Sequence, residues 1–220
     1  GQISTHEVFD KISELESWSP ESINPKMVGR REGWWGSTEN FESFMDELIT
    51  WRELGYHTCV RRANYNQYSS LPEWAIKTLH EHSSDEREHI YSLDELTYSQ
   101  THDEIWNAAQ NQLRTQGVIQ NYLRMLWGKK ILEWTPNPQI ALSYMITLND
   151  RYSLDGRDPN SYSGVFWILG RYDRAWGPER SIFGKIRYMT SDSTARKFNL
   201  KPYLEKWGNE SLGVSTSILK

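Results

Sequence analysis

The feature that most constrains this chain is one apolar segment typical of a buried helix. Residues 121–134 read Asn-Tyr-Leu-Arg-Met-Leu-Trp-Gly-Lys-Lys-Ile-Leu-Glu-Trp, and a Thr-Pro pair that a helix does not extend through follows them. Apolar side chains recur at helical spacing at Leu123, Trp127, Ile131 and Trp134. The two indoles lie two turns apart, about 10.5 Å along the axis. A third aromatic ring nearby would complete a chain of aromatic steps from the interior outward.

A second face of the same segment is polar. Asn121, Arg124 and Met125 are spaced i, i+3 and i+4, so an amide, a cation and a thioether share one side of the helix. A charge within an apolar helix needs an acidic partner or a ligand. The sequence therefore predicts that Arg124 is paired.

Composition favours one all-α domain over residues 1–220. The chain has 220 residues, 37% of them hydrophobic, which is enough for one sizeable core, and no segment shows sustained strand alternation. A single cysteine excludes a disulfide framework, and no signal peptide or membrane-length apolar run is present. We expect an intracellular, soluble protein, cytoplasmic if prokaryotic, with no membrane partner. His80 and His82 lack a second ligand pair, so no metal site is predicted.

Charge is distributed unevenly along the chain. Residues 1–110 carry 20 acids and 9 bases, whereas residues 151–201 carry 5 acids and 10 bases. A polyanion would approach the C-terminal part, although a charge-mixed surface explains such an excess equally well.

Helix boundaries can be placed from local signals. Ser92 with Glu95, and Thr101 with Glu104, have capping-box spacing and predict two helix starts, and Gly117 is expected to end the second helix. This second helix would bring Trp106 beside Trp127.

Residues 150–190 lose regular periodicity and are predicted to form a long irregular loop. Turn-forming residues lead into Trp167, and several arginines then alternate with aromatic residues, among them Trp176 and Arg187. This composition suits contacts to phosphates and exposed bases, with solvated arginines over an aromatic core as the alternative.

An acidic residue and an indole also recur together near the N-terminus. Glu47 and Trp51 are spaced i and i+4 in an expected helix. They could hydrogen-bond and stack on one flat ligand, or they could be a solvated carboxylate beside a core indole.

Several blocks together resemble the flavin-binding domain of class II cyclobutane pyrimidine dimer photolyases. They are the 121–134 segment, Leu-Asp-Gly-Arg-Asp-Pro-Asn-Ser-Tyr-Ser-Gly, Gly-Arg-Tyr-Asp-Arg-Ala-Trp-Gly-Pro-Glu-Arg, and Asp-Glu-Leu-Ile-Thr-Trp-Arg-Glu-Leu-Gly. The resemblance runs in order from the first residues to about Trp207. It implies a helical FAD-binding domain of the photolyase/cryptochrome type that repairs pyrimidine dimers in DNA by light-driven electron transfer from reduced FAD.

The resemblance also implies roles for single residues. Arg124 and Asp155 would form a salt bridge beside the flavin, and Asn149 would face its N5 edge. Three indoles would relay electrons from the surface to the flavin: Trp127, Trp106 and Trp134. The remaining positions would bind the flipped dimer and the surrounding UV-damaged DNA: Glu47, Trp51, Trp167, Met125, Asn121, Trp176 and Arg187.

Two departures from the family follow. The N-terminal antenna domain and the segment around the FAD phosphates would precede Gly1 and are absent from the 220 residues, and Gln120 stands where a histidine is expected. A second chain carrying the missing N-terminal portion is a further candidate partner. Two other hypotheses remain: a cryptochrome-like light sensor, and a non-catalytic, flavin-free helical fragment or assembly subunit. Retention of the dimer-binding positions argues against the sensor.

Overall fold

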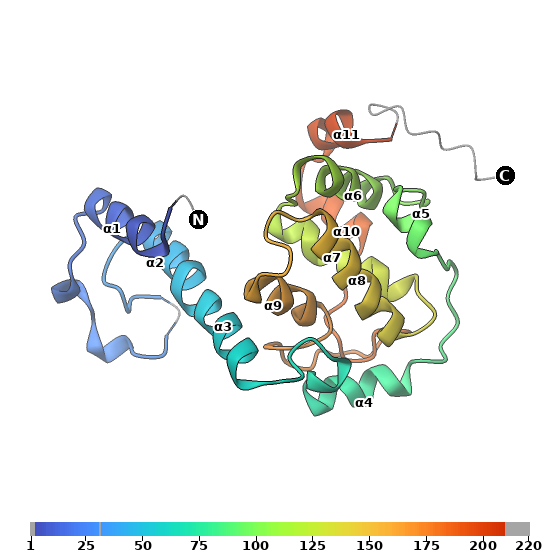
Figure 1. The fold of residues 1–220 in the computed structure, drawn as a ribbon, viewed down its shortest axis with the longest axis horizontal. Helices are drawn as coiled ribbons and strands as arrows, with labels where there is room; N and C mark the ends of the chain where they lie inside the picture. The colour runs from blue at the N-terminus through green and yellow to red at the C-terminus, as the bar shows by residue number, and fades with distance from the viewer. Residues whose placement is uncertain (1–2, 31, 210–220) are drawn as a thin grey trace. The chain divides into compact units, whose positions relative to one another are not determined.

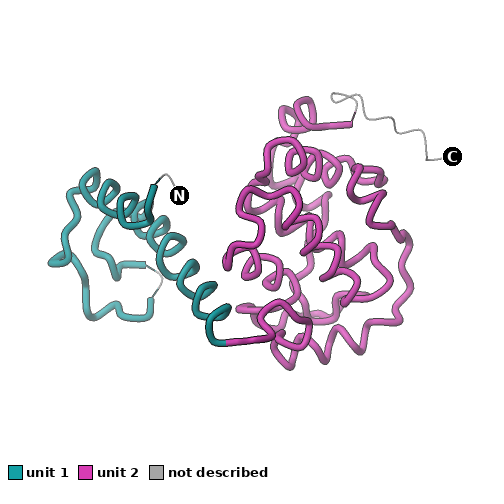
Figure 2. The backbone as a smooth tube through the Cα atoms, viewed as in Figure 1, with its two compact units in different colours: residues 1–61 teal, residues 62–220 magenta. Residues whose placement is uncertain are grey.

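The chain folds into two compact helical units, 1–61 and 62–220 (Figure 2). The structure is a computed structural model and describes residues 3–30 and 32–209. No β-strand occurs in these ranges, which confirms the all-α prediction. The assignment of residues 1–220 to one domain stays a prediction.

The first unit consists of helices joined by a long loop with two short 3-10 turns. Its elements are α1 (Thr5–Leu15), η1 (Pro20–Ser22), η2 (Pro25–Met27), α2 (Glu39–Met45), the π-helix η3 (Asp46–Trp51) and α3 (Arg52–Arg61). An aromatic cluster packs the loop against the helices, with the rings of Trp18 and Phe41 stacked 5.6 Å apart. The buried carboxylate of Glu42 accepts hydrogen bonds from the backbone N–H groups of Gly33 and Gly36. These contacts fix the loop on the start of α2.

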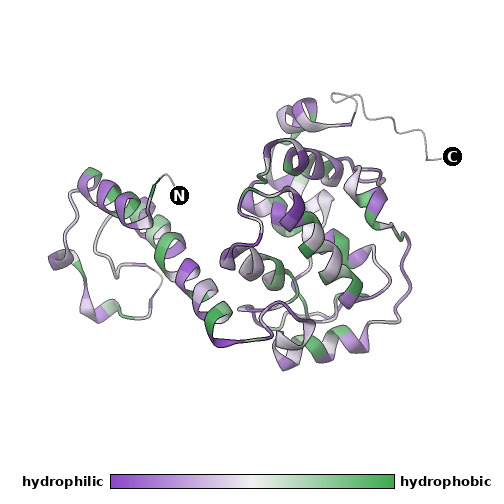
Figure 3. Cartoon of the chain, in the orientation of Figure 1, coloured by the Kyte–Doolittle hydropathy of each residue, from purple (hydrophilic) through white to green (hydrophobic). Residues whose placement is uncertain are grey.

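The second unit contains the organising segment and most of the predicted site. Its elements are η4 (Tyr68–Ser70), α4 (Glu73–Glu81), α5 (Leu93–Thr97), α6 (Glu104–Gln116), α7 (Asn121–Glu133), α8 (Pro138–Tyr152), α9 (Pro159–Ile168), α10 (Ser191–Lys197) and α11 (Lys201–Trp207) (Figure 1). Helix α7 packs against α6, α8 and α9. Hydrophobic and hydrophilic residues alternate along these helices (Figure 3), as expected when one side of each faces the core.

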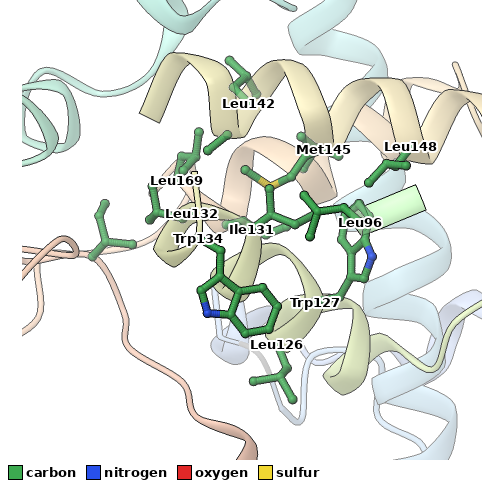
Figure 4. Packing of buried hydrophobic residues seen from close by; sticks show 14 of the residues in the cluster. Leu96, Leu126, Trp127, Ile131, Leu132, Trp134, Leu142, Met145, Leu148 and Leu169 are labelled. Atoms are coloured by element: carbon green, nitrogen blue, oxygen red, sulfur yellow. The ribbon is translucent and has the colours of Figure 1, made fainter. Parts of the chain in front are cut away.

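Helix α7 is the centre of the hydrophobic core. Its residues Leu126, Trp127, Ile131 and Leu132 are at most 1% exposed. They belong to one cluster of buried apolar side chains that also contains Met145 of α8 (Figure 4). Burial of each large apolar side chain contributes about 1.5–3 kcal/mol. The prediction of a buried helix over residues 121–134 is confirmed, with Trp134 as its C-terminal cap.

One of the two predicted capping boxes is present. Ser92 and Glu95 exchange both hydrogen bonds at the start of α5. The second predicted helix start is confirmed, because α6 begins at Glu104, but its capping box is wrong: the side chain of Asp103 caps α6, and Thr101 bonds to Asn107. Gly117 ends α6 with φ +73°, a left-handed conformation that glycine adopts without strain.

The predicted loop over residues 150–190 is partly wrong. Helix α9 forms inside it, because the Asp158 side chain accepts from the backbone N–H of Asn160 and Pro159 occupies the first helical position. Polar residues that are typical of turns therefore begin a helix, and Trp167 lies on α9 and not in a loop. Residues 169–190 are irregular, as predicted. Among the described residues, none of the helices is both long and apolar enough to cross a bilayer.

Candidate functional site

The half-buried guanidinium on α7 has the acidic partner that its position requires. Arg124 forms a two-pronged ion pair with Asp155, with N–O distances of 3.1 and 3.5 Å. Burial raises the pKa of the Asp155 carboxyl, but a hydrogen bond from Ser153 and the Arg124 charge outweigh it. The net pKa lies below its ordinary value. Asp155 is therefore ionised at neutral pH, and the cation of Arg124 is held in place.

A buried amide is linked to this ion pair. Asn149, on α8, is 3% exposed, and its Nδ2 donates to Ser161 Oγ over 3.0 Å. Ser161 in turn donates to the backbone carbonyl of Asp155 over 2.5 Å. Arg124, Asp155, Ser161 and Asn149 thus form one continuous polar network across α7, α8 and α9.

The three predicted relay indoles meet in the core. Trp106, Trp127 and Trp134 are all at most 2% exposed. Trp106 Nε1 donates to the backbone oxygen of Trp127 over 2.9 Å, and the rings of Trp106 and Trp134 are 5.7 Å apart, edge to face. Trp127 Nε1 donates to Gln110 Oε1 over 2.8 Å. Each of the two innermost indoles therefore has its polar group satisfied, as burial requires.

Trp134 connects this group to a surface cavity. It lines a cavity of about 410 Å³ together with His89, His102 and Lys130. The Trp134 ring is 5.2 Å from that of His102, and the Tyr91 hydroxyl lies 2.7 Å from His102 Nδ1. Burial and the neighbouring His89 lower the pKa of His102. The aromatic series thus ends beside a polar opening and not at an exposed indole.

A second group of cations and rings forms in the irregular segment after α9. The guanidinium carbons of Arg174 and Arg187 lie 4.1 and 4.3 Å from the Trp176 ring centroid. Asp173 accepts from Trp176 Nε1 and twice from Arg187, each over 3.1 Å. Burial raises the pKa of Asp173, but the hydrogen bonds from Arg187 and its other donors lower it by more, so the net pKa lies below its ordinary value. Trp176 and Arg187 are thereby held together, as one rigid element.

This element borders a cavity of about 430 Å³ whose lining is basic and aromatic. The lining contains three cations and three large rings but no acid: Arg180, Arg187, Lys197, Tyr122, Trp176 and Tyr188, with Gly177, Pro178, Ile186 and Met189. Lys197 Nζ lies 4.4 Å from the Tyr122 ring centroid. Such a cavity attracts anions and offers flat surfaces for stacking.

The other predicted dimer-binding residues are divided between the units. Asn121 is exposed at the start of α7, Met125 is half-buried one turn on, and Trp167 is half-buried on α9. Glu47 and Trp51 belong to the first unit, in the π-helix η3. There Trp51 Nε1 donates to Asp46 Oδ2 over 2.9 Å, across five residues. A π-helix aligns residues i and i+5, so the i, i+4 spacing assumed from the sequence does not describe this turn.

Sequence reasoning missed several residues that hold the site together. Ser161 and Gln110 each fix one predicted site residue through a hydrogen bond, and Asp173 fixes two, Trp176 and Arg187. Their residue types are common in turns and on helix surfaces, so no sequence signal distinguishes them. Only the packing of the helices around α7, and of the irregular segment after α9, reveals them.

The network of the second unit suits a flavin ring. The polar edge of an isoalloxazine needs a hydrogen-bonding group at N5 and positive charge near its carbonyl oxygens. Asn149 supplies a buried amide, and Arg124 supplies a cation fixed by Asp155. A planar ring system also suits the half-buried apolar side chain of Met125. The donor set therefore fits the cofactor that the resemblance implies.

Comparison with known proteins relates the chain to a segment of larger enzymes. No protein-family model matches it. It is 49% identical over 163 residues, 74% of the chain, to the deoxyribodipyrimidine photo-lyase of Methanothermobacter thermautotrophicus, of which it covers 36%. It is 40% identical over 207 residues, 94% of the chain, to the protein of that name from Potorous tridactylus, of which it covers 35%. The Oryza sativa protein of the same name is 45% identical over 76% of the chain, which covers 33% of it. The chain thus spans about a third of the length of the curated relatives it matches, and these similarities support a relationship to the photolyase family.

Proposed function

We propose that this chain is the C-terminal, flavin-binding part of a class II photolyase that repairs cyclobutane pyrimidine dimers in DNA by light-driven electron transfer. The observation that carries the proposal is 49% identity over 163 residues to a protein named deoxyribodipyrimidine photo-lyase. The polar network of Arg124, Asp155 and Asn149 supports it, because its chemistry suits a flavin. An N-terminal photolyase portion, on the same or another chain, would complete the enzyme.

In this proposal the second unit provides the cofactor site. Arg124, fixed by Asp155, presents positive charge to the ring, and Asn149 hydrogen-bonds its N5 edge. Bound FAD, when reduced and excited by light, supplies the electron for repair. Trp127, Trp106 and Trp134 offer an electron path between the cavity and the interior.

The substrate would be a pyrimidine dimer flipped out of the duplex. Glu47 would hydrogen-bond a dimer carbonyl, and two indoles, Trp51 and Trp167, would stack on the bases. Asn121 and Met125 would line the pocket. A damaged, poorly stacked step costs less to extrude than normal bases, which favours the lesion over intact DNA.

The surrounding DNA would meet the basic cavity of the second unit. Arg187 and Lys197 supply phosphate contacts, and Trp176 supplies a stacking surface, with no acid in the lining to repel the strand. Local charge thus accounts for nucleic-acid binding by a chain whose net charge is −4.

The first test is the visible absorption spectrum of the purified chain with and without added FAD. We expect flavin bands at a fixed stoichiometry, and weaker binding in Arg124→Gln. Arg151→Gln is the matched control, because Arg151 is exposed on α8 and lies outside the network. A colourless chain that binds no FAD would favour the flavin-free fragment over the enzyme.

The second test separates the relay from repair. Trp127→Phe should block photoreduction of the flavin while leaving dimer repair by chemically reduced protein intact. Equal loss of both activities would contradict the relay assignment. Flavin photoreduction without any dimer repair would instead favour the light sensor.

A further inference from the structure

Asn149 is held by one neighbour whose hydrogen-bonding options are limited. Ser161 lies in the first turns of α9, is 2% exposed, and receives the Asn149 Nδ2 donor over 3.0 Å. Helix α8 packs directly on α9, so both partners lie on rigid elements. This contact decides which way the Asn149 amide is turned.

The single hydroxyl proton of Ser161 fixes the orientation of the Asn149 amide. A serine hydroxyl has a single proton, and Ser161 donates it to the backbone carbonyl of Asp155 over 2.5 Å. A carbonyl oxygen can only accept, so the proton cannot be used elsewhere. Toward Asn149 the hydroxyl can therefore act only as an acceptor, which requires the NH₂ group of Asn149 to face it. The reversed amide would place two acceptors against each other.

We propose that Ser161 is a positioning residue that locks the Asn149 amide with its carbonyl oxygen turned toward the bound ligand. This inference rests on the proposed flavin site. An acceptor oxygen suits a ligand atom that carries a proton, and reduced flavin carries one on N5 whereas oxidised flavin does not. Ser161, without touching the cofactor, would thus set the preference of the site for reduced over oxidised FAD.

The same hydroxyl also links the amide to the ion pair. The Asp155 carbonyl that Ser161 binds belongs to the residue whose carboxylate holds Arg124. A substitution at Ser161 should therefore affect the position of both polar groups of the proposed flavin site, the Asn149 amide and the Arg124 guanidinium. A matched control exists two residues along α9: Ser163 bonds only its own helix, at the Pro159 carbonyl.

The orientation can be tested without any flavin. In the nitrogen-15 NMR spectrum, the Asn149 side-chain NH₂ should exchange slowly with solvent in the unaltered chain and in Ser163→Ala. Ser161→Ala should remove this protection, and Ser161→Thr, which keeps the hydroxyl, should restore it. Unchanged protection in Ser161→Ala would overturn the proposal.

The consequence for the cofactor is tested by binding oxidised FAD and, anaerobically, chemically reduced FAD. Ser161→Ala should lower the affinity ratio of reduced to oxidised FAD on the order of tenfold, the effect of one lost hydrogen bond. The same substitution in an Asn149→Ala background should leave the ratio unchanged, because the serine acts through the amide. An unaltered ratio in Ser161→Ala would refute the redox preference. If neither form of FAD binds, the proposed function fails for this chain, and the NMR result still decides the role of Ser161.

Discussion

Lys129 should make the stability of the second unit depend on pH above neutrality. Its side chain is 0% exposed in the centre of α7, and its ammonium donates to the Ile168 carbonyl, at the end of α9, over 2.5 Å. Burial lowers the pKa of Lys129 from 10.5 to about 7, against the opposing charge of Asp173. The ammonium thus stabilises the end of the helix that carries Trp167 at the cost of its own desolvation.

The sign of the effect follows from the protons bound in each state. Between the folded pKa and the unfolded value of 10.5, the unfolded chain keeps the Lys129 proton and the folded chain has released it. The free energy of unfolding therefore rises with pH in this window, and the desolvation cost is fully present below it. From the two pKa values the rise amounts to about 3 kcal/mol between pH 6 and pH 9.

Chemical denaturation at a series of pH values measures this rise. Lys129→Met keeps the side-chain volume and removes the titrating group, so the difference between the two stability curves isolates Lys129. Lys130→Met is the control, because Lys130 is the next residue along α7 and its ammonium is paired with Glu133 over 2.8 Å. Its curve should keep the rise. Parallel curves for the unaltered chain and Lys129→Met would refute the reasoning.

Three further outcomes follow from the contacts. Gly128→Ala should cost about 1–3 kcal/mol in a denaturation assay, because the new Cβ would lie 2.1 Å from Ile168 Cδ1. Gly164→Ala, with open space at its Cβ, should instead gain up to about 1 kcal/mol, and similar losses would contradict this packing argument. Lys197→Ala should reduce the slope of log affinity for single-stranded DNA against log salt by about one, whereas the exposed Lys201→Ala should leave it unchanged. The pKa of Asp155 is lower in the folded chain than in the unfolded chain. The ion pair with Arg124 should therefore stabilise the fold fully above the unfolded pKa of Asp155, and this stabilisation should be lost as the pH falls through the folded pKa. The stability difference from Arg124→Gln should therefore shrink in acid titration, and a constant difference would exclude a working ion pair.

The central helix could be predicted because its pattern leaves few alternatives. Apolar residues at helical spacing over residues 121–134, with a Pro just beyond them, do not fit a strand or a surface loop. The same holds for Gly117, which supplies the left-handed backbone that ends α6. Helix α9 was missed because polar turn-forming residues also cap helices, and only tertiary packing decides between the two uses. Thr101 lost its predicted capping role to Asp103 for the same reason.

The candidate site likewise has a part that the sequence predicts and a part that only packing determines. An arginine on an apolar helix requires a partner on energetic grounds alone, so the existence of the Arg124 pair could be derived, but its identity as Asp155 came from resemblance and is now seen in the contacts. The residues that orient the predicted site residues do not require a partner in the same way, because water satisfies the hydrogen bonds of a serine or a glutamine in any exposed position. Ser161 becomes informative only when burial removes water and the Asp155 carbonyl takes its single proton. Sequence thus predicts which groups need partners, whereas the orientation of those groups, and with it any preference among ligand states, is set by packing.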